Sequence, residues 1–329
     1  MRRRDFITLL GSAAAAWPLA ARAQPKERRL GILMGFSAND ADAQTRLAAF
    51  RHKLAELGWT DSKNIRIEER WASGNLEQMQ PSAADLIATS PDALLGVTVA
   101  AVQALHRETG TIPIVFTQVS DPIGSGLIEN LARRGGNITG FTNFEASMGG
   151  KWLELLKEIA PGIKRAGFLF NPGTAAGGGA FYLSSFNSAA ASLAIEPVAL
   201  PVRDDAEITQ SIDVFARQAP SGLMVMPDAF TLVHRDRIVG LATQYRVPAV
   251  YPFRFFGQIG GLLCYGIDAM EQFPKAAAYI DRILKGAKAG DLPVQQSSKF
   301  ELVVNLKTAK ALGLAIPGTM LARADEVIE

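Results

Sequence analysis

Short apolar runs, most of them continuous, alternate along this chain with segments whose apolar residues recur every three or four positions. No other feature limits the possible folds as strongly. The apolar runs are bounded by turn residues and lie at 30–35, 65–71, 93–97, 112–117, 138–142, 166–170, 197–202, 223–226, 248–251, 262–265 and 300–304. Continuous apolar runs of this length are typical of parallel strands that are covered on both faces.

The segments between the runs have the spacing of amphipathic helices. Their apolar positions include Leu47, Phe50, Leu54 and Leu57, then Trp152, Leu155, Leu156 and Ile159, then Ile208, Ile212 and Phe215, and finally Phe273, Ala277, Ile280 and Leu284. Strands that alternate with helices form a parallel, doubly wound sheet. Because ten or more strands exceed one ordinary sheet, we expect an α/β fold with two parallel sheets in two lobes.

The break between the lobes is expected at 143–150, where a strand ends and a new helix begins. The last two strands follow a complete second set of strands and helices. This order indicates that the chain returns to the first lobe near Pro252 and leaves it again near Val294. The predicted first lobe therefore holds 28–143 and 252–294, and the second holds 144–251 and 295–329. Two lobes joined in this way can close around a ligand.

The first 23 residues have the pattern of an export signal. Arg3-Arg4-Asp5-Phe6-Ile7 resembles a twin-arginine signal, a mildly apolar stretch follows, and Ala21-Arg22-Ala23 provides an A-x-A cleavage site. A membrane anchor is the alternative, but an apolar stretch of about 15 residues is short for a bilayer. The sequence predicts cleavage after Ala23 and a periplasmic mature chain.

Charge and cysteine content exclude several classes of protein. The formal charge of +2 falls to −1 when the four arginines and one aspartate of the signal are removed, so no basic surface for nucleic acid is expected. No later apolar run is long enough to span a bilayer, so we expect no membrane insertion of the mature chain. The single cysteine, Cys264, excludes an intrachain disulfide and a four-cysteine zinc site.

Candidate ligand-binding residues are those that directly follow the strands, since ligands bind beyond the carboxyl ends of parallel sheets. Phe36 and Ser37 follow the first strand, and Thr98, Val99 and Ala100 follow the third. Thr98 is placed to cap a helix whose free N–H groups would favour a ligand carboxylate. An ordinary helix N-cap is the alternative interpretation.

Asp121 lies in the loop after the fourth strand, before Gly124 and Gly126, which permit tight backbone geometry. Its carboxylate could hold a ligand ammonium group or accept hydrogen bonds from the turn, and the sequence leaves both open. Asn143 and Glu145 follow the next strand and are expected at the same edge of the sheet.

The second half offers three more candidates. Tyr182 follows a glycine-rich segment, 177–179, that suits a flexible flap over a ligand. Asp228 and Arg254 follow strands of the second sheet, where each is either a cleft residue or part of a surface ion pair. The glycine-rich segment matches neither a Walker A nor a G-x-G-x-x-G pattern, so no nucleotide cofactor is indicated.

Short catalytic and metal-binding patterns are lacking in the sequence. His52, His106 and His234 match no such signature, and His52 and His106 lack ligand spacing. Cys264 lies inside an apolar run and is expected to be an inert buried thiol. We therefore expect a non-catalytic protein that needs no metal and no cofactor.

Five segments in order along nearly the whole mature chain carry a family pattern. They are 114–127, which contains Ser120-Asp121-Pro122, then 135–140, 151–158, 265–268 and 299–307. As a set they resemble the ABC-transporter substrate-binding proteins that include the tryptophan-binding periplasmic proteins. The resemblance implies a type I periplasmic-binding fold, with two Rossmann-like lobes, three crossovers and a ligand in the cleft. It also implies delivery of the ligand to a permease.

The resemblance implies site residues as well. The aspartate of the S/T-D-P segment, here Asp121, is placed at the ligand in that family. The loop that matches Thr98, Val99 and Ala100 would offer backbone N–H groups to a carboxylate. Asp268, which ends the segment 265–268, is assigned to the site with them.

Three segments depart from the family pattern. Val97-Thr98-Val99-Ala100 stands in place of an A-T-P-A-type turn, Pro227-Asp228-Ala229-Phe230 in place of a polar T-D-N segment, and an aromatic stretch with Arg254 in place of an acidic one at 251–256. Aromatic side chains could form an apolar side of the site; they are Phe36, Tyr182, Phe230 and Phe253. With Arg254 as a partner for a second carboxylate, we expect an aromatic or acyl carboxylate rather than tryptophan.

The leading interpretation is a monomeric solute-binding protein that closes by a hinge around a small molecule and delivers it to an ABC permease of the inner membrane. A twin-arginine-exported periplasmic enzyme is one alternative, since that route handles folded, often cofactor-loaded proteins. A ligand-sensing module for a membrane receptor is the other, and it differs only in its partner.

Overall fold

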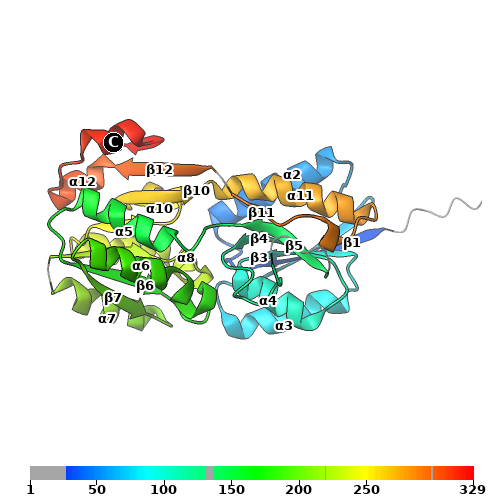
Figure 1. The fold of residues 1–329 in the computed structure, drawn as a ribbon. Coiled ribbons are helices and arrows are strands. Elements are labelled where there is room, and N and C mark those ends of the chain that lie inside the picture. Colours follow the sequence, from blue (N-terminus) through cyan, green and yellow to red (C-terminus); the bar gives the residue numbers. More distant parts are fainter. Residues whose placement is uncertain (1–26, 131–135, 219, 298) are drawn as a thin grey trace, which may run out of the picture.

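Two α/β lobes lie side by side and are joined by chain segments that cross between them (Figure 1). The structure is a computed structural model that describes residues 27–130, 136–218, 220–297 and 299–329. The export signal predicted at 1–23 lies outside the described residues. Each lobe contains one sheet flanked by helices, which confirms the expected fold class.

The first sheet has six parallel strands in the order β11-β5-β4-β3-β1-β2. In chain order they are β1 (Arg28–Met34), β2 (Ile65–Trp71), β3 (Ala93–Val97), β4 (Ile114–Val119), β5 (Ile138–Thr142) and β11 (Gln295–Gln296). Helices α2 (Ala41–Glu56) and α11 (Gln272–Leu284) cover one face, and α3 (Leu76–Ala88) and α4 (Val99–Glu108) cover the other. Ile32 and Leu33 belong to the two different apolar clusters on these faces, as the alternation of side chains along a strand requires.

The second sheet has seven strands in the order β13-β12-β10-β9-β8-β6-β7. In chain order they are β6 (Arg165–Phe170), β7 (Glu196–Pro201), β8 (Ser221–Val225), β9 (Ala249–Tyr251), β10 (Leu263–Ile267), β12 (Phe300–Asn305) and β13 (Glu326–Ile328). All neighbours are parallel except β10 and β12, which are antiparallel. The chain reaches β12 from the carboxyl end of β11 in the other lobe, so β12 starts at the edge that faces that lobe and runs away from it (Figure 1).

Eight α-helices accompany the second sheet in the described chain. They are α5 (Met148–Ile159), α6 (Ala180–Ser192), α7 (Asp205–Ala216), α8 (Ala229–Val233), α9 (Arg235–Gln244), α10 (Arg254–Gln258), α12 (Leu306–Leu312) and α13 (Gly318–Arg323). Short 3₁₀ turns lie at Ala176–Gly179, Ala269–Glu271 and Ala289–Asp291. The helical patterns predicted from the sequence fall on α2, α5, α7 and α11.

The chain crosses between the lobes after β5, after β10 and after β11. The return expected near Pro252 is therefore wrong: residues 252–267 contain α10 and β10, and β10 pairs with β9 and β12 in the second sheet. The exit expected near Val294 is also too early, because Gln295 and Gln296 pair with β5 in the first sheet. An apolar run shows that a strand is buried, but not which of two sheets buries it.

Candidate functional site

Residues that follow the strands of one sheet lie against residues that follow the strands of the other. Ser120 comes directly after β4 and contacts Tyr182 of α6. Gly74 comes after β2, and a Cβ added to it would lie 3.3 Å from the carbonyl oxygen of Ala229 in α8. The carboxyl edges of the two sheets therefore meet, which is where ligands bind in open α/β sheets.

Four polar residues at this edge of the first sheet have positive φ angles. Ser73 after β2 has φ 51°, Thr98 after β3 has φ 89°, Gln118 in β4 has φ 55°, and Asp121 after β4 has φ 49°. Such backbone costs a non-glycine residue about 1–3 kcal/mol and persists where the surrounding structure holds it. Backbone strain of this kind clusters at ligand-binding sites.

Buried polar atoms at the same edge have no hydrogen-bond partner in the described chain. They are Oγ1 of Thr98, Oγ1 of Thr117, and both amide atoms of Gln118. All three residues are buried, and only 4% of the surface of Gln118 is exposed. Nearly every buried polar group in a folded protein is hydrogen-bonded, so a cluster of such groups between two lobes has the chemistry of a site that receives a polar ligand.

Helix α4 begins beside this cluster with free N–H groups. Thr98 occupies the N-cap position, but its side chain makes no capping hydrogen bond, because the backbone turns it toward Gly35. A Cβ at Gly35 would lie only 2.3 Å from Thr98 Oγ1, so this close approach requires glycine. The first N–H groups of α4, including those of Val99 and Ala100, have no partner within the helix and favour an anion.

Gln272 connects the carboxyl edge of the first sheet to the segments that cross between the lobes. Its Oε1 accepts a hydrogen bond from Gln118 N at 2.8 Å. Its Nε2 lies within hydrogen-bond distance of Thr142 O (3.0 Å), Asn143 Oδ1 (3.2 Å) and Ser297 Oγ (3.0 Å). These partners follow or end β5 and β11, and Gln272 itself follows the crossing after β10. One side chain that is 1% exposed therefore holds all three crossings together.

Tyr182 joins the lobes through its phenol group. The hydroxyl lies 2.7 Å from Ser120 Oγ, and the ring packs on Trp152 at 5.3 Å between centroids. Burial raises the pKa of Tyr182 well above its usual range, so the phenol stays protonated. α6 approaches α5 closely at Gly149, where a Cβ would lie 2.2 Å from the Tyr182 carbonyl oxygen. The segment expected as a flap forms a 3₁₀ turn that leads into α6.

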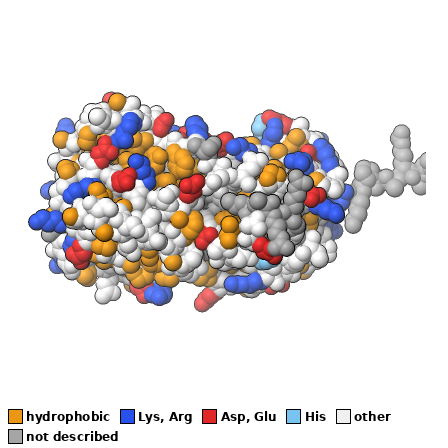
Figure 2. Space-filling view, in the orientation of Figure 1, with side chains coloured by type: hydrophobic (Ala, Val, Ile, Leu, Met, Phe, Trp, Pro, Cys, Tyr) orange, Lys and Arg blue, Asp and Glu red, His pale blue; other side chains and the backbone are white. Residues whose placement is uncertain are grey.

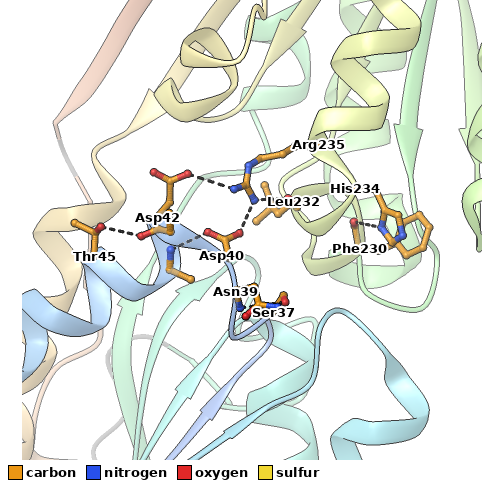
Figure 3. Close-up of polar contacts among 11 residues, drawn as sticks. Ser37, Asn39, Asp40, Asp42, Thr45, Phe230, Leu232, His234 and Arg235 are labelled. Carbon is orange, nitrogen blue, oxygen red and sulfur yellow. Dashed lines mark hydrogen bonds and ion pairs between the residues drawn. The ribbon is translucent and has the colours of Figure 1, made fainter.

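A second polar contact between the lobes centres on Arg235, the first residue of α9 (Figure 3). Its Nη1 pairs with Asp40 Oδ2 and its Nη2 lies 3.4 Å from Asp42 Oδ2, both at the start of α2. Asp40 also caps α2 by accepting a hydrogen bond from Ala43 N at 2.9 Å. The Arg235 and Asp40 side chains are 14% and 5% exposed, so this ion pair is largely screened from water.

Asp121 is held by its own turn, as one of its two interpretations requires. Its Oδ1 accepts a hydrogen bond from Gly124 N at 2.8 Å. No hydrogen bond to Oδ2 is recorded within the described residues. The carboxylate is close enough to Tyr182 to raise the pKa of that phenol, so Asp121 lies beside the contact between the lobes.

Asp228 forms no ion pair among the described residues; it is a buried helix cap at the start of α8, which faces the first lobe. It caps α8 through Thr231 N (2.9 Å) and also accepts hydrogen bonds from Asn171 N (3.1 Å) and Thr174 Oγ1 (2.8 Å). Burial raises its pKa to about 6, although these hydrogen bonds oppose the shift. Both carboxylate oxygens are occupied, so the role that the structure gives Asp228 is to join α8 to the end of β6.

Arg254 forms surface ion pairs, which was one of its two interpretations. Its Nη2 lies 2.8 Å from Glu326 and its Nη1 lies 3.9 Å from Glu301, both in the second lobe. Its neighbours Phe253 and Phe255 are buried, while 45% of the Arg254 side chain is exposed. The structure therefore does not bring Arg254 to the polar edge of the first sheet.

The remaining candidate residues already make hydrogen bonds or packing contacts within the protein. Ser37 Oγ accepts a hydrogen bond from Asn39 N at 3.3 Å, and Phe36 is buried beneath Arg46 of α2. Asn143 bonds Gln272, and Asp268 caps the next 3₁₀ turn through Met270 N at 2.9 Å. Sequence reasoning missed Gln118, Gln272, Arg46 and Arg235, although Gln118 lies directly at the end of a predicted strand.

A cavity of about 540 Å³ lies elsewhere, at the amino ends of β8 and β9 in the second lobe. Pro161, Tyr245, Pro248 and Leu314 are among its largely apolar lining. The cavity lies at the amino edge of the second sheet, whereas the two lobes meet at the carboxyl edges of their sheets. Parallel sheets seldom hold ligands at the amino edge.

The described parts of the chain contain no group of three or more His, Cys, Asp or Glu side chains that could hold a metal ion. Among the same residues, no helix is long and apolar enough to cross a membrane. Basic and acidic side chains are interspersed over the face in Figure 2, without a patch of one sign. Burial raises the pKa of the Cys264 thiol, as expected of an inert cysteine.

Comparison with known proteins identifies relatives over most of the chain. Residues 38–328 match the sequence pattern of the ABC transporter substrate binding proteins. A tyrosine-binding protein from Clostridioides difficile (strain R20291) is 27% identical over 266 residues, which are 80% of this chain and 75% of that protein.

Solved structures share the fold. An ABC domain in complex with L-Trp from Streptococcus pneumoniae has a TM-score of 0.83 at 24% identity, over 92% of this chain and 100% of that one. The ligand-free, open structure of a substrate binding protein with adhesive properties from Clostridium difficile has a TM-score of 0.64 at 25% identity, over 92% and 99%. The fold is that of the type I periplasmic binding proteins, as expected.

Proposed function

The chain belongs to the ABC transporter substrate binding protein family, and from that premise we propose that it binds an amino-acid-like carboxylate between its two lobes. In this proposal the protein acts in the periplasm as a monomer and passes the ligand to an ABC permease of the inner membrane. It performs no catalysis and needs no cofactor.

One observation carries the proposal: the buried, unpartnered polar atoms of Thr98, Thr117 and Gln118 lie beside the free N–H groups of α4. The N–H groups suit a carboxylate. Asp121 Oδ2 is the group that would take an ammonium, since Oδ1 is engaged by Gly124 N. Phe36 and Tyr182 supply aromatic surface from the two lobes. The tyrosine-binding relative favours an aromatic amino acid as the first ligand to test.

Closure of the lobes is the mechanism that we propose for ligand capture. The Tyr182–Ser120 and Arg235–Asp40 contacts connect residues of different lobes, so they can form only when the lobes are together. Gln272 would serve as the fixed point of the hinge, since it bonds to all three crossings.

Thermal unfolding against a panel of ligands tests the proposal. The panel holds amino acids, aromatic and aliphatic carboxylates, sugars, purines, and nicotinamide and flavin cofactors. L-Tyrosine or a related aromatic carboxylate at 100 times its Kd is expected to add about 2.7 kcal/mol, which raises Tm by several degrees. A shift with a redox cofactor or a sugar alone would contradict the proposal.

The Gln118→Met variant separates binding from stability. The amide of Gln118 is buried without a partner, so its removal is expected to leave the ligand-free protein equally stable or to stabilise it by about 1 kcal/mol. The same change should weaken binding of the panel ligand about tenfold or more, since one hydrogen bond to a charged group is lost. Urea unfolding and calorimetry measure the two effects.

Gln103→Met is the matched control, because Gln103 Nε2 donates to Ser125 O at 3.1 Å. That variant should lose stability and keep affinity. A Gln118→Met protein that loses stability without losing affinity would show that Gln118 supports the fold and not the ligand.

A further inference from the structure

Arg46 is a buried cation that has no hydrogen-bonding or anionic partner among the described residues. It lies on the inner face of α2, and only 3% of its surface is exposed. Its Nε is buried without a partner. No hydrogen bond and no ion pair within 4.0 Å to its guanidinium is recorded among the residues that the structure describes. A buried charge is costly unless an acceptor reaches it.

Two aromatic rings, one from each lobe, contact the guanidinium. Its Cζ lies 4.9 Å from the ring centroid of Phe36 and 5.5 Å from that of Phe255. The face of an aromatic ring attracts a cation but provides no oxygen acceptor for its N–H donors. Because Phe255 belongs to the second lobe, this arrangement is complete only when the lobes are together.

The two nearby carboxylates are engaged elsewhere. Asp40 and Asp42 both pair with Arg235, and Asp40 also caps α2. Burial lowers the pKa of Arg46 to about 10, with Arg235 acting in the same direction and the two aspartates opposing it. The guanidinium is therefore charged at neutral pH and still lacks a direct partner.

Both anion-binding groups flank the end of β1. Thr98, at the start of α4, lies against Gly35, and Arg46 lies against the next residue, Phe36. We propose that Arg46 binds a second carboxylate of the ligand, while the start of α4 binds the first. The inference rests on the proposed function only in placing the ligand between the lobes. It assigns to Arg46 the role that the sequence suggested for Arg254.

The test compares ligands that differ by one carboxylate. The probes are benzoate against terephthalate, and L-phenylalanine against 4-carboxy-L-phenylalanine, titrated by calorimetry. In at least one pair, the wild-type protein is expected to bind the dicarboxylate about tenfold tighter or more than the monocarboxylate. This is the change in Kd that corresponds to one hydrogen bond between charged groups. In Arg46→Met, which keeps an apolar stem between the rings, this preference should disappear.

Arg237→Ala is the matched control, because Arg237 lies on α9 but donates its hydrogen bonds to Thr209 within the second lobe. It should leave the affinity for both members of a pair, and therefore the preference, unchanged. Retention of the preference in Arg46→Met would overturn the inference. Failure of the wild-type protein to bind either dicarboxylate would overturn it as well.

Two further experimental outcomes distinguish a failure of this inference from a failure of the proposed function. If terephthalate binds with an Arg46-dependent preference and no amino acid binds, the amino-acid part of the proposed function fails and the inference stands. Without ligand, Arg46→Met should unfold at the wild-type Tm or above, because it removes an unpaired buried charge. A Tm lower by more than about 5 °C would show that the guanidinium supports the fold itself, and would overturn the inference.

Discussion

Replacement of Arg235 with alanine is expected to weaken ligand binding by about 30- to 1,000-fold. The change leaves Asp40 buried at the contact between the lobes without its cation. Truncation of one partner of a buried charge pair costs about 2–4 kcal/mol, and each 1.4 kcal/mol is a factor of ten in Kd. The loss falls on the closed arrangement, so it should appear as a faster dissociation rate in stopped-flow experiments.

Arg237→Ala is the control for this prediction. Arg237 lies on the same helix, but it donates hydrogen bonds to Thr209 within the second lobe. Its replacement should leave Kd unchanged. Asp40→Asn, which keeps an oxygen to cap α2, should weaken binding as Arg235→Ala does, and the double variant should lose little more than either single one. Equal affinity in Arg235→Ala and the wild-type protein would mean that the ion pair does not stabilise closure.

Replacement of Gln272 with alanine is expected to lower the free energy of unfolding by about 2–4 kcal/mol, because it leaves several buried groups without partners. These include Gln118 N and Asn143 Oδ1. Since the lost bonds tie the crossings together, ligand affinity should fall with stability. Urea unfolding and calorimetry measure the two quantities.

Gln210→Ala serves as the control, since Gln210 is an exposed residue of α7. It should change stability by less than about 0.5 kcal/mol. Gln272→Glu keeps an acceptor for Gln118 N but places a buried carboxylate against the oxygens of Thr142 and Asn143, so it should destabilise the protein at least as much as Gln272→Ala. A fully stable Gln272→Ala protein would show that the three crossings need no common side chain.

The apolar runs of the sequence predicted most strands, because β1, β3 to β6, β8 to β10 and β12 are largely buried and most of them contain consecutive apolar residues. The edge strands β2 and β7 are mostly half-buried or exposed. β11 and β13 were missed, since β11 consists of two exposed glutamines and β13 is a three-residue strand without a fully buried position. The assignment of 252–267 failed for a different reason. β10 is buried between β9 and β12, and its sequence looks the same as that of a strand in the other sheet.

The candidate site was only partly predictable. The rule that ligands follow strand ends located Phe36, Thr98 and Asp121, which lie near the contact between the lobes. Arg46 carried a signal that was overlooked, namely a charged residue among the buried positions Ala43, Leu47 and Phe50 of one helix face. Gln272 carried none, because its importance depends on three chain segments that are far apart in sequence.

A crystal structure of the protein bound to L-tyrosine, or to the panel compound that raises Tm most, tests whether the ligand lies between the lobes. We expect its carboxylate at the N–H groups of Val99 and Ala100 and a polar contact to Gln118. A ligand bound instead in the outer cavity beside Tyr245 and Leu314, with the Gln118 amide still unpartnered, would contradict this expectation.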